Sequence, residues 1–479
     1  MTYSQFLQMI PEAVLVLLLI VVFIADFATS KQEERRWFNP FVGVLMLAAF
    51  VVSAVPWEPQ SLFGGMYVTT AATNVMKAIL TGATLIVIIM SRQWLYNTET
   101  KVREGEFYLL TLSTLLGMYT MMSAGHFLMF FLGLEMASIP MACLVALDKW
   151  RNDSAEGAAK YILTATFSSG VMLMGLSLIY GACGTLYFTG VAAAIKPSLL
   201  TIVGVVFFLS GLGFKISLVP FHFWTADTYQ GAPTVVTGYL SVVSKGAAAF
   251  TLMVILLKVF ASMAFFSQYF LYVVIVLSIT VANLFAIRQS ELKRFMAFSS
   301  ISQAGYIMLA LVGNDATSPT ALMYYILVYV VANLSVFSII SVVEQNNGGR
   351  TDIDAYNGFY KTNPKLSFLM TLALFSLAGI PPFAGMFSKF FVFMAAGKMM
   401  DTTSYIVLFI ALVNTVVSLY YYLLIVKAMY IKDAENPLPT FKSDWNTRLA
   451  LCLCTAGVFL FGIVSCLYDY LYRAAEMSF

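Results

Sequence analysis

Long apolar segments follow one another along almost the whole chain, and short polar segments separate them. A membrane-spanning helix needs about 20 mainly apolar residues, and fourteen segments of this sequence have that character. Helices are expected at residues 10–28, 39–55, 70–91, 106–123, 126–147, 157–181, 198–220, 233–257, 268–287, 296–312, 319–343, 366–397, 403–426 and 449–470. The pattern therefore predicts an all-α polytopic membrane protein with about 14 transmembrane helices.

The composition agrees with this class. The chain is 60% hydrophobic and 11% charged, whereas a soluble domain has about 25% charged residues. No C-x-x-C pair, P-loop, hydrolytic constellation or haem-type histidine pair is found in the sequence. We therefore predict no cofactor and no metal in this chain. All five cysteines lie within or at the ends of predicted spans: Cys143, Cys183, Cys452, Cys454 and Cys466.

Basic residues are distributed unevenly between the two sides of the fourteen-span arrangement. Of the 27 lysines and arginines, eighteen lie in the seven loops of one side, and four lie on the other side, termini included. The positive-inside rule makes the first side cytoplasmic, so both termini face outward. The remaining five are inside predicted spans: Lys77, Lys160, Lys215, Lys245 and Lys389.

Spans four to eight and nine to thirteen form two consecutive sets of five. Because five is odd, the second set crosses the membrane in the opposite direction to the first, as expected for an inverted-topology repeat. In such repeats the functional sites form on broken helices. We predict three helices in residues 1–105, repeats at 106–260 and 261–431, and a last helix in 432–479.

The seventh and twelfth spans, each fourth in its set, are predicted to be broken. The break in the seventh is at "LVPFH" and the break in the twelfth at "GIPPFAG". Lys215 lies five residues before Pro220, and Lys389 lies eight after Pro381. Each break therefore has a lysine within about two helical turns.

Three of the lysines are candidates for proton transfer. An ionised side chain at the bilayer centre costs about 2.5–3.5 kcal/mol on insertion scales. Snorkelling to a headgroup is the structural alternative, but Lys215 and Lys245 lie ten or more residues from one end of their spans. Chains of intramembrane ionisable groups form proton relays. Glu135 is the expected counter-charge, and which lysine it meets is open.

Other polar residues carry weaker predictions. Lys160 stands one turn inside its span, and an interfacial role and a role in proton transfer are equally compatible with that position. For Lys77, near the start of its span, we favour a structural role. For His222 we favour a role in the proton relay over the alternative, a hydrogen bond to backbone groups left unpaired at the helix break. His126 is expected at the interface, and Asp227 as a helix cap.

Four sequence stretches resemble the antiporter-like subunits of respiratory complex I, the proton-pumping NADH:quinone oxidoreductase. They are "GLEMASIP" around Glu135, "PFHFWTADTYQGAPTVVTGYLSVVSKGAAAF" at 220–250, "ELKRFMAFSSISQAGYIMLAL" at 291–311 and "LAGIPPFAGMFSKFFVF" at 377–393. Among these subunits the sequence is most similar to the N-type, because it has a lysine in the twelfth helix and ends soon after the fourteenth span. Gln303 departs from a histidine of many relatives, Ala226 from a proline and Gln230 from a glutamate.

The resemblance implies a role for each matching residue. Glu135 and Lys215 would form a coupling ion pair, Lys245 would be the central relay group, and Lys389 would lead to the periplasmic exit. Lys160 and His222 would be auxiliary groups.

The resemblance also implies partners and location. NADH, FMN, iron–sulfur clusters and quinone would belong to partner subunits, and this chain would sit with other membrane-arm subunits in a bacterial inner membrane, both termini periplasmic. It would bind no nucleic acid and no small molecule other than protons and water. The alternative is a subunit of a multi-subunit sodium/proton antiporter. A passive membrane-arm scaffold would not need the three deep lysines.

Overall fold

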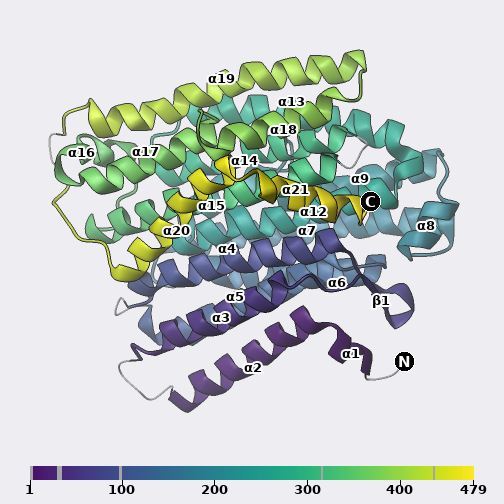
Figure 1. The fold of residues 1–479 in the computed structure, drawn as a ribbon, viewed down its shortest axis with the longest axis horizontal. Helices are drawn as coiled ribbons and strands as arrows, with labels where there is room; N and C mark the ends of the chain where they lie inside the picture. Colours follow the sequence, from purple (N-terminus) through teal and green to yellow (C-terminus); the bar gives the residue numbers. More distant parts are fainter. Residues whose placement is uncertain (1–3, 30–34, 97–99, 314–316, 435–436) are drawn as a thin grey trace.

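A computed structural model describes residues 4–29, 35–96, 100–313, 317–434 and 437–479. The long helices lie side by side along the horizontal direction of Figure 1, and the two termini lie at the same end. Within the described residues, eleven helices are long and apolar enough to cross a membrane. Three shorter apolar helices accompany them, at Phe38–Ala54, Pro364–Ala378 and Ala384–Gly397.

The N-terminal part precedes the two predicted repeats. A short antiparallel hairpin, β1 paired with β2, connects its second and third long helices. The elements are α1 (Ser4–Gln8), α2 (Ile10–Thr29), α3 (Phe38–Ala54), β1 (Gln60–Leu62), β2 (Tyr67–Thr69) and α4 (Ala71–Leu95).

The first predicted repeat consists of α5 to α12. Helices α5 and α6 pack together, as do α7 and α9. The elements are α5 (Glu104–Met122), α6 (Phe127–Val145), α7 (Asn152–Cys183), α8 (Phe188–Ala194), α9 (Leu199–Ile216), α10 (Phe223–Gly231), α11 (Thr234–Tyr239), the π-helical segment η3 (Leu240–Ser244) and α12 (Lys245–Lys258).

The second predicted repeat has a similar order. Helices α13 and α14 pack together, and α15 packs on both α17 and α18. The elements are α13 (Ala264–Ile287), α14 (Leu292–Leu309), α15 (Thr317–Asn346), α16 (Phe359–Thr362), α17 (Pro364–Ala378), α18 (Ala384–Gly397) and α19 (Thr402–Tyr430), followed by α20 (Trp445–Ile463) and α21 (Ser465–Glu476).

Each of the fourteen predicted spans overlaps a helix, and both predicted breaks are present. Helix α9 ends at Ile216, where Ser217 takes a left-handed conformation with φ 67°. Helix α17 ends at Ala378, where Gly379 has φ 88°, a conformation that glycine adopts without steric cost. The sequence pattern did not predict the π-helical segment before Lys245, because its apolar periodicity continues through it.

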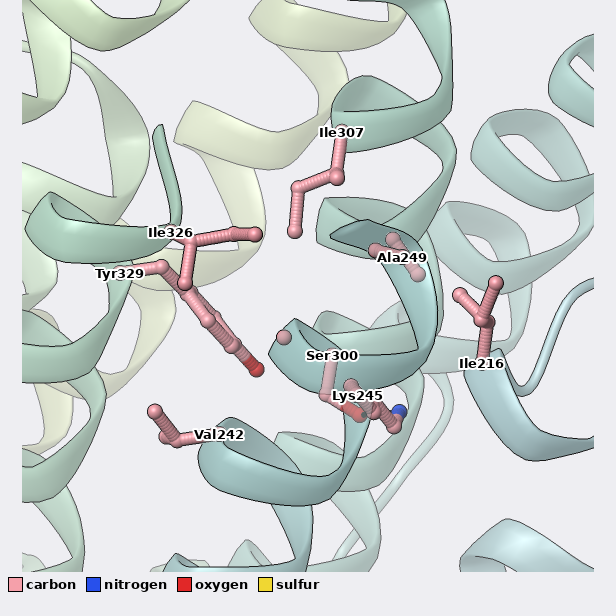
Figure 2. A pocket seen from close by; sticks show the side chains of 10 residues that line it. Ile216, Val242, Lys245, Ala249, Ser300, Ile307, Ile326 and Tyr329 are labelled. Atoms are coloured by element: carbon pink, nitrogen blue, oxygen red, sulfur yellow. Dashed lines mark hydrogen bonds between the residues drawn. The ribbon is translucent and has the colours of Figure 1, made fainter. Parts of the chain in front are cut away.

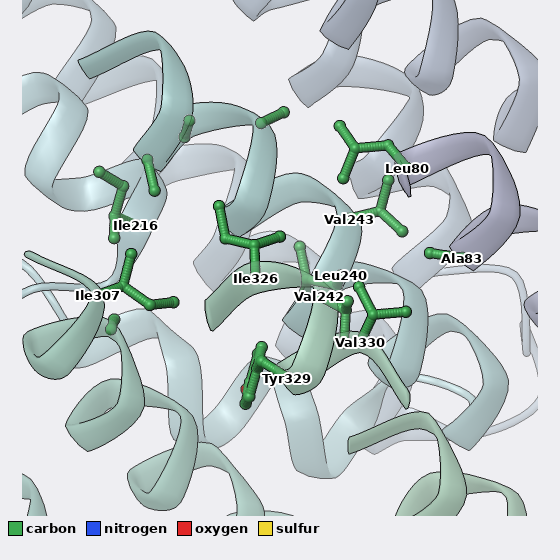
Figure 3. Close-up of a cluster of buried hydrophobic side chains, with 14 of the residues drawn as sticks. Leu80, Ala83, Ile216, Leu240, Val242, Val243, Ile307, Ile326, Tyr329 and Val330 are labelled. Atoms are coloured by element: carbon green, nitrogen blue, oxygen red, sulfur yellow. The ribbon is translucent and has the colours of Figure 1, made fainter. Parts of the chain in front are cut away.

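A cluster of buried apolar side chains lies where α4, η3 and α15 meet. Figure 3 shows Leu80, Leu240, Val243, Ile326 and Val330 packed there. All five are almost inaccessible to solvent. The three candidate lysines therefore face a dense apolar interior, in which every polar atom needs a partner.

Candidate functional site

Lys215 stands at the last turn of α9, directly before the break. Its side chain is 3% exposed. Its ammonium donates to the Ser138 hydroxyl at 2.8 Å and to the Tyr161 hydroxyl at 3.1 Å. Trp224 of α10 donates to the carbonyl of Phe214 at 3.2 Å, so the broken end of α9 is satisfied by a side chain. Lys215 is thus held by two neutral hydroxyl groups from two other helices.

Glu135 lies near this lysine without touching it. Its carboxylate accepts a hydrogen bond from Ser169 of α7, and its charge acts on Lys215 through space. Among the described residues no ion pair within 4.0 Å joins the two. Ser138, one turn after Glu135 on α6, is a direct partner of Lys215, and its own hydroxyl donates to the carbonyl of Leu134. In this conformation the two members of the coupling pair implied by the resemblance therefore bond different neighbours, Lys215 the hydroxyls of Ser138 and Tyr161 and Glu135 the hydroxyl of Ser169.

Lys245 follows the π-helical segment at the start of α12 and is 2% exposed. Its ammonium donates to the Ser300 hydroxyl of α14 at 2.7 Å. It also lies 5.3 Å from the centre of the Tyr229 ring, whose hydroxyl is 3.2 Å from that of Ser300. The described residues offer it no carboxylate within ion-pair distance. π-Helical turns often occur at functional sites, and this one directly precedes Lys245.

A small cavity borders Lys245 and Ser300. Figure 2 shows Tyr329 of α15 and Ile326 across it from these two residues. Its volume is about 10 Å³, near the lower limit for one water molecule. The Tyr329 hydroxyl is buried and has no hydrogen-bond partner within the described part of the chain.

Lys389 lies on α18, beyond the second break, and is 4% exposed. Its ammonium donates to the carbonyl of Ala378 at 2.9 Å, at the broken end of α17. A second cavity of about 10 Å³ borders it, and Tyr329 lines this cavity too. Tyr329 therefore lies between the surroundings of Lys245 and those of Lys389.

Gln303, where the resemblance led us to expect histidine, lines this second cavity. Its amide nitrogen donates to the carbonyl of Leu377 at 3.2 Å and to the Tyr422 hydroxyl at 3.1 Å, and Tyr325 donates to its amide oxygen. An amide has no titratable proton, so Gln303 holds partners in place and cannot carry charge.

The two residues predicted as auxiliary lie apart from each other. Lys160 is 43% exposed and pairs with Glu156 and with Asp227, each at 2.6 Å. His222 is buried, stacks on Phe223, and its Nδ1 atom has no partner among the described residues. Coulombic interaction reaches it from Lys245. Lys160 thus lies at the protein surface, and His222 lies near the central lysine.

Asp227 belongs to an ion cluster, although a capping role was expected. Arg294 of α14 contacts its second oxygen at 2.6 Å, so Asp227 joins Lys160 of α7 to α14. Partial burial alone would raise the pKa of Asp227, but the hydrogen bonds from Lys160 and Arg294 lower it below its ordinary value. The carboxylate stays charged, which suits a fixed link between α7 and α14.

Lys77, for which a structural role was favoured, forms the most enclosed ion pair among the described residues. Its ammonium lies 2.6 Å from Glu12, and the two side chains are 0% and 5% exposed. Tyr67 donates to the other Glu12 oxygen at 2.9 Å, and the rings of Tyr67 and Tyr119 lie 5.3 and 5.5 Å from the ammonium. The pair has all its partners and binds α2 to α4.

Several side chains of the site were missed by the sequence reasoning. Ser138, Tyr229 and Ser300 lie in stretches that carry the resemblance but were given no role, and Tyr161 and Tyr329 lie outside those stretches. A hydroxyl in an apolar helix commonly bonds its own backbone. Only the packing of separate helices shows that these hydroxyl groups face the lysines.

The fold is similar to that of known membrane proteins. A family model described as "NADH:quinone oxidoreductase/Mrp antiporter, TM" matches residues 124–418. A chain of respiratory complex I from Thermus thermophilus has a TM-score of 0.81 and 30% identity, covering 96% of this chain and 98% of that one. A chain of the Mrp complex from Dietzia has a TM-score of 0.83 at 19% identity, covering 98% and 97%, and shows likeness of fold alone.

Closer relatives define the branch. The chain is 55% identical to NADH-quinone oxidoreductase subunit N of Phocaeicola vulgatus over 98% of its own length and 99% of that protein. Identity to subunit N of Azobacteroides pseudotrichonymphae is 48%, over 98% of each chain. The chain therefore belongs to the NADH:quinone oxidoreductase/Mrp antiporter family, in the branch of the proton-translocating subunits N of respiratory complex I. The predicted family, function and all-helical membrane fold are confirmed.

Proposed function

We propose that protons move through this subunit along a relay of buried lysines, Lys215, Lys245 and Lys389. One observation carries the proposal: Tyr329 lines both water-sized cavities, one beside Lys245 and the other beside Lys389. The lysines have only neutral partners in the described chain. An ammonium without a counter-ion in an apolar interior can lose its proton readily, so each lysine is suited to hold a proton transiently.

Glu135 sets the state of the first lysine. A charge acts strongly over several ångströms in a low-dielectric interior. Protonation of Glu135, or a rotation that lets it displace Ser138 and pair directly with Lys215, changes how firmly Lys215 holds its proton. That change alters the field at Lys245, which exchanges with Lys389 through Tyr329 and water. His222 tunes Lys245, and Lys160 anchors the cytoplasmic side.

The relay needs an external source of energy. Moving one charge against the membrane potential costs about 2.3 kcal/mol per 100 mV. In the described residues no group of three or more His, Cys, Asp and Glu side chains could hold a metal ion. Membership of the subunit N branch of complex I supports placing NADH, FMN, iron–sulfur clusters and quinone in partner subunits, and the drive would reach this chain through its neighbours in the membrane arm.

The membrane topology follows from the same proposal. Fourteen spans would put both termini on the same side of a bacterial inner membrane, and the positive-inside rule makes that side periplasmic; both termini lie at one end of the helices (Figure 1). Residues 106–260 and 261–431 form inverted five-helix repeats, flanked by residues 1–105 and 432–479. The similar helix pairs and the two breaks support this division.

Proton uptake by inverted membrane vesicles, driven by NADH, tests the relay with Lys245→Ala. We expect proton uptake per NADH oxidised to fall although the complex assembles. Lys258→Ala is the matched control, because Lys258 ends the same helix and lies 5.1 Å from the Phe479 ring, remote from the cavities. Wild-type stoichiometry in Lys245→Ala would exclude the relay. A sodium-dependent pH gradient in vesicles without NADH dehydrogenase would instead support the sodium/proton alternative.

A further inference from the structure

A groove outside the relay lies between the start of α17 and residues 448–459 of α20. Its volume is about 820 Å³. Figure 1 shows α16, α17 and the start of α20 at the same end of the molecule, and α17 and α20 pack against each other. This end carries the loops rich in lysine and arginine, which the proposed topology places in the cytoplasm.

The mouth of the groove is positively charged. Lys365, Lys442 and Arg448 line it, and all three are exposed. None of the three has an ion-pair partner within the described residues, and the lining contains no carboxylate. By contrast, the nearby Lys361 and Lys432 are each paired with an aspartate. The groove therefore gathers three cations that form no ion pair with a described carboxylate.

Hydrogen bonds fix the polar walls. The buried Asn363 donates to the carbonyl of Pro439 at 3.0 Å and accepts from the backbone of Phe441 at 3.2 Å. Thr440 donates to the carbonyl of Thr362 at 3.1 Å. The segment that carries Lys442 is thereby tied to the start of α17, so the mouth is a built feature of the fold.

Below the mouth the groove becomes apolar. Leu366 and Leu369 of α17 face Leu451 and Phe459 of α20 in its lining. Arg448 and Phe459 are eleven residues apart, which is ~16 Å along an α-helix. That length matches one leaflet, about half of the 30 Å hydrocarbon thickness. The groove thus has a charged end at headgroup depth and an apolar floor of one leaflet's depth.

We propose that this groove binds an anionic phospholipid of the cytoplasmic leaflet. The three cations would hold its phosphate, and an acyl chain would lie along α20. Basic pockets between membrane helices on the cytoplasmic side attract anionic headgroups, and charge complementarity selects this occupant over a neutral lipid. The ring of Phe459 lies 5.2 Å from that of Phe383, a residue in the break between α17 and α18. The acyl chain of the bound lipid would therefore pack beside this break and stabilise it from the membrane side.

Photochemical cross-linking tests the site in the purified, reconstituted complex that contains this chain. The probes are phosphatidylglycerol and phosphatidylcholine carrying the same photoactivatable acyl chain, and labelled peptides are identified by mass spectrometry. We expect phosphatidylglycerol to label α17 and α20 preferentially. The triple variant Lys365→Gln, Lys442→Gln, Arg448→Gln should lose most of this labelling, several-fold or more. The matched control Lys361→Gln, Lys432→Gln should keep it.

A second variant leaves the charges in place. Ala456→Trp fills the apolar part of the groove and should also reduce labelling, which guards against a triple variant that fails to assemble. Four results would overturn the proposal: equal labelling by both lipids, labelling that survives the triple substitution, competition by inorganic phosphate, or cross-links from these helices to a neighbouring subunit in place of lipid.

Discussion

The Glu12–Lys77 pair provides a sharp test of how buried charges in this chain divide between structure and transport. Helix α2 is the least buried of the long helices, and Leu15, Leu18 and Val22 form most of its buried face. Its charged contact with α4 is the 2.6 Å ion pair. We therefore expect the pair to hold α2 in place and to take no part in proton transfer.

The magnitude follows from the burial of both partners. Removing one member of a buried pair leaves an uncompensated charge and costs about 3–5 kcal/mol, whereas replacing both with uncharged groups costs much less. Lys77→Met and Glu12→Gln should each destabilise the subunit strongly. The double variant should recover a large part of that loss, because no unpaired charge remains.

The assay is a double-variant cycle on the purified complex, with the temperature at which this subunit dissociates as its readout. Proton uptake per NADH is measured on the assembled fraction, where every variant should match wild type. Additive losses in the double variant would refute the pairing argument. Lowered proton uptake by intact Glu12→Gln complex would refute the structural role and extend the relay to α2.

Three further outcomes are expected. Gly379→Ala should lower both the assembly of the subunit and proton uptake. Its new Cβ would lie 3.0 Å from the Lys389 Cδ, and the left-handed backbone conformation costs about 1–2 kcal/mol for a residue with a side chain. Wild-type proton uptake would disprove this prediction. Tyr329→Phe should assemble normally but slow proton uptake at unchanged NADH affinity, and a wild-type rate would remove its hydroxyl from the path. Because the pKa of Asp227 is lowered in the folded state, its ion pair with Lys160 stabilises the chain above about pH 4 and is lost on acidification. In Asp227→Asn the melting temperature should therefore fall less between neutral and acidic pH than in wild type. An equal fall in both proteins would contradict the stabilising role of this ion pair.

The spans and their breaks could be predicted because both are local. An apolar run of membrane length forms a helix wherever it lies, and prolines at 220 and 381 stop helices by geometry. Lys215 accordingly lies in the last turn before the first break, and Lys389 lies in the second turn of the helix that follows the other break. Conversely, the π-helical turn before Lys245 is a shift in backbone hydrogen bonding that leaves no mark on apolar periodicity.

Contacts between distant segments could not be predicted from a single sequence. Ser138 and Tyr161 lie on two different helices, and only their packing against α9 turns them into partners of Lys215. Glu12 and Lys77 are separated by 65 positions, so their pairing was equally invisible. The burial of Lys215, Lys245 and Lys389 could be predicted from their depth in apolar runs, whereas Lys293, counted with the loops, is also buried and Lys160, placed inside a span, is 43% exposed. The partner of each charge depends on how the helices pack.

NADH-driven proton uptake by Lys215→Ala, in inverted vesicles with matched amounts of assembled complex, tests the central claim most directly. The relay predicts that proton uptake per NADH falls while NADH oxidation by the intact complex persists. Unchanged uptake together with unchanged NADH oxidation would make Lys215 a structural residue and contradict the relay.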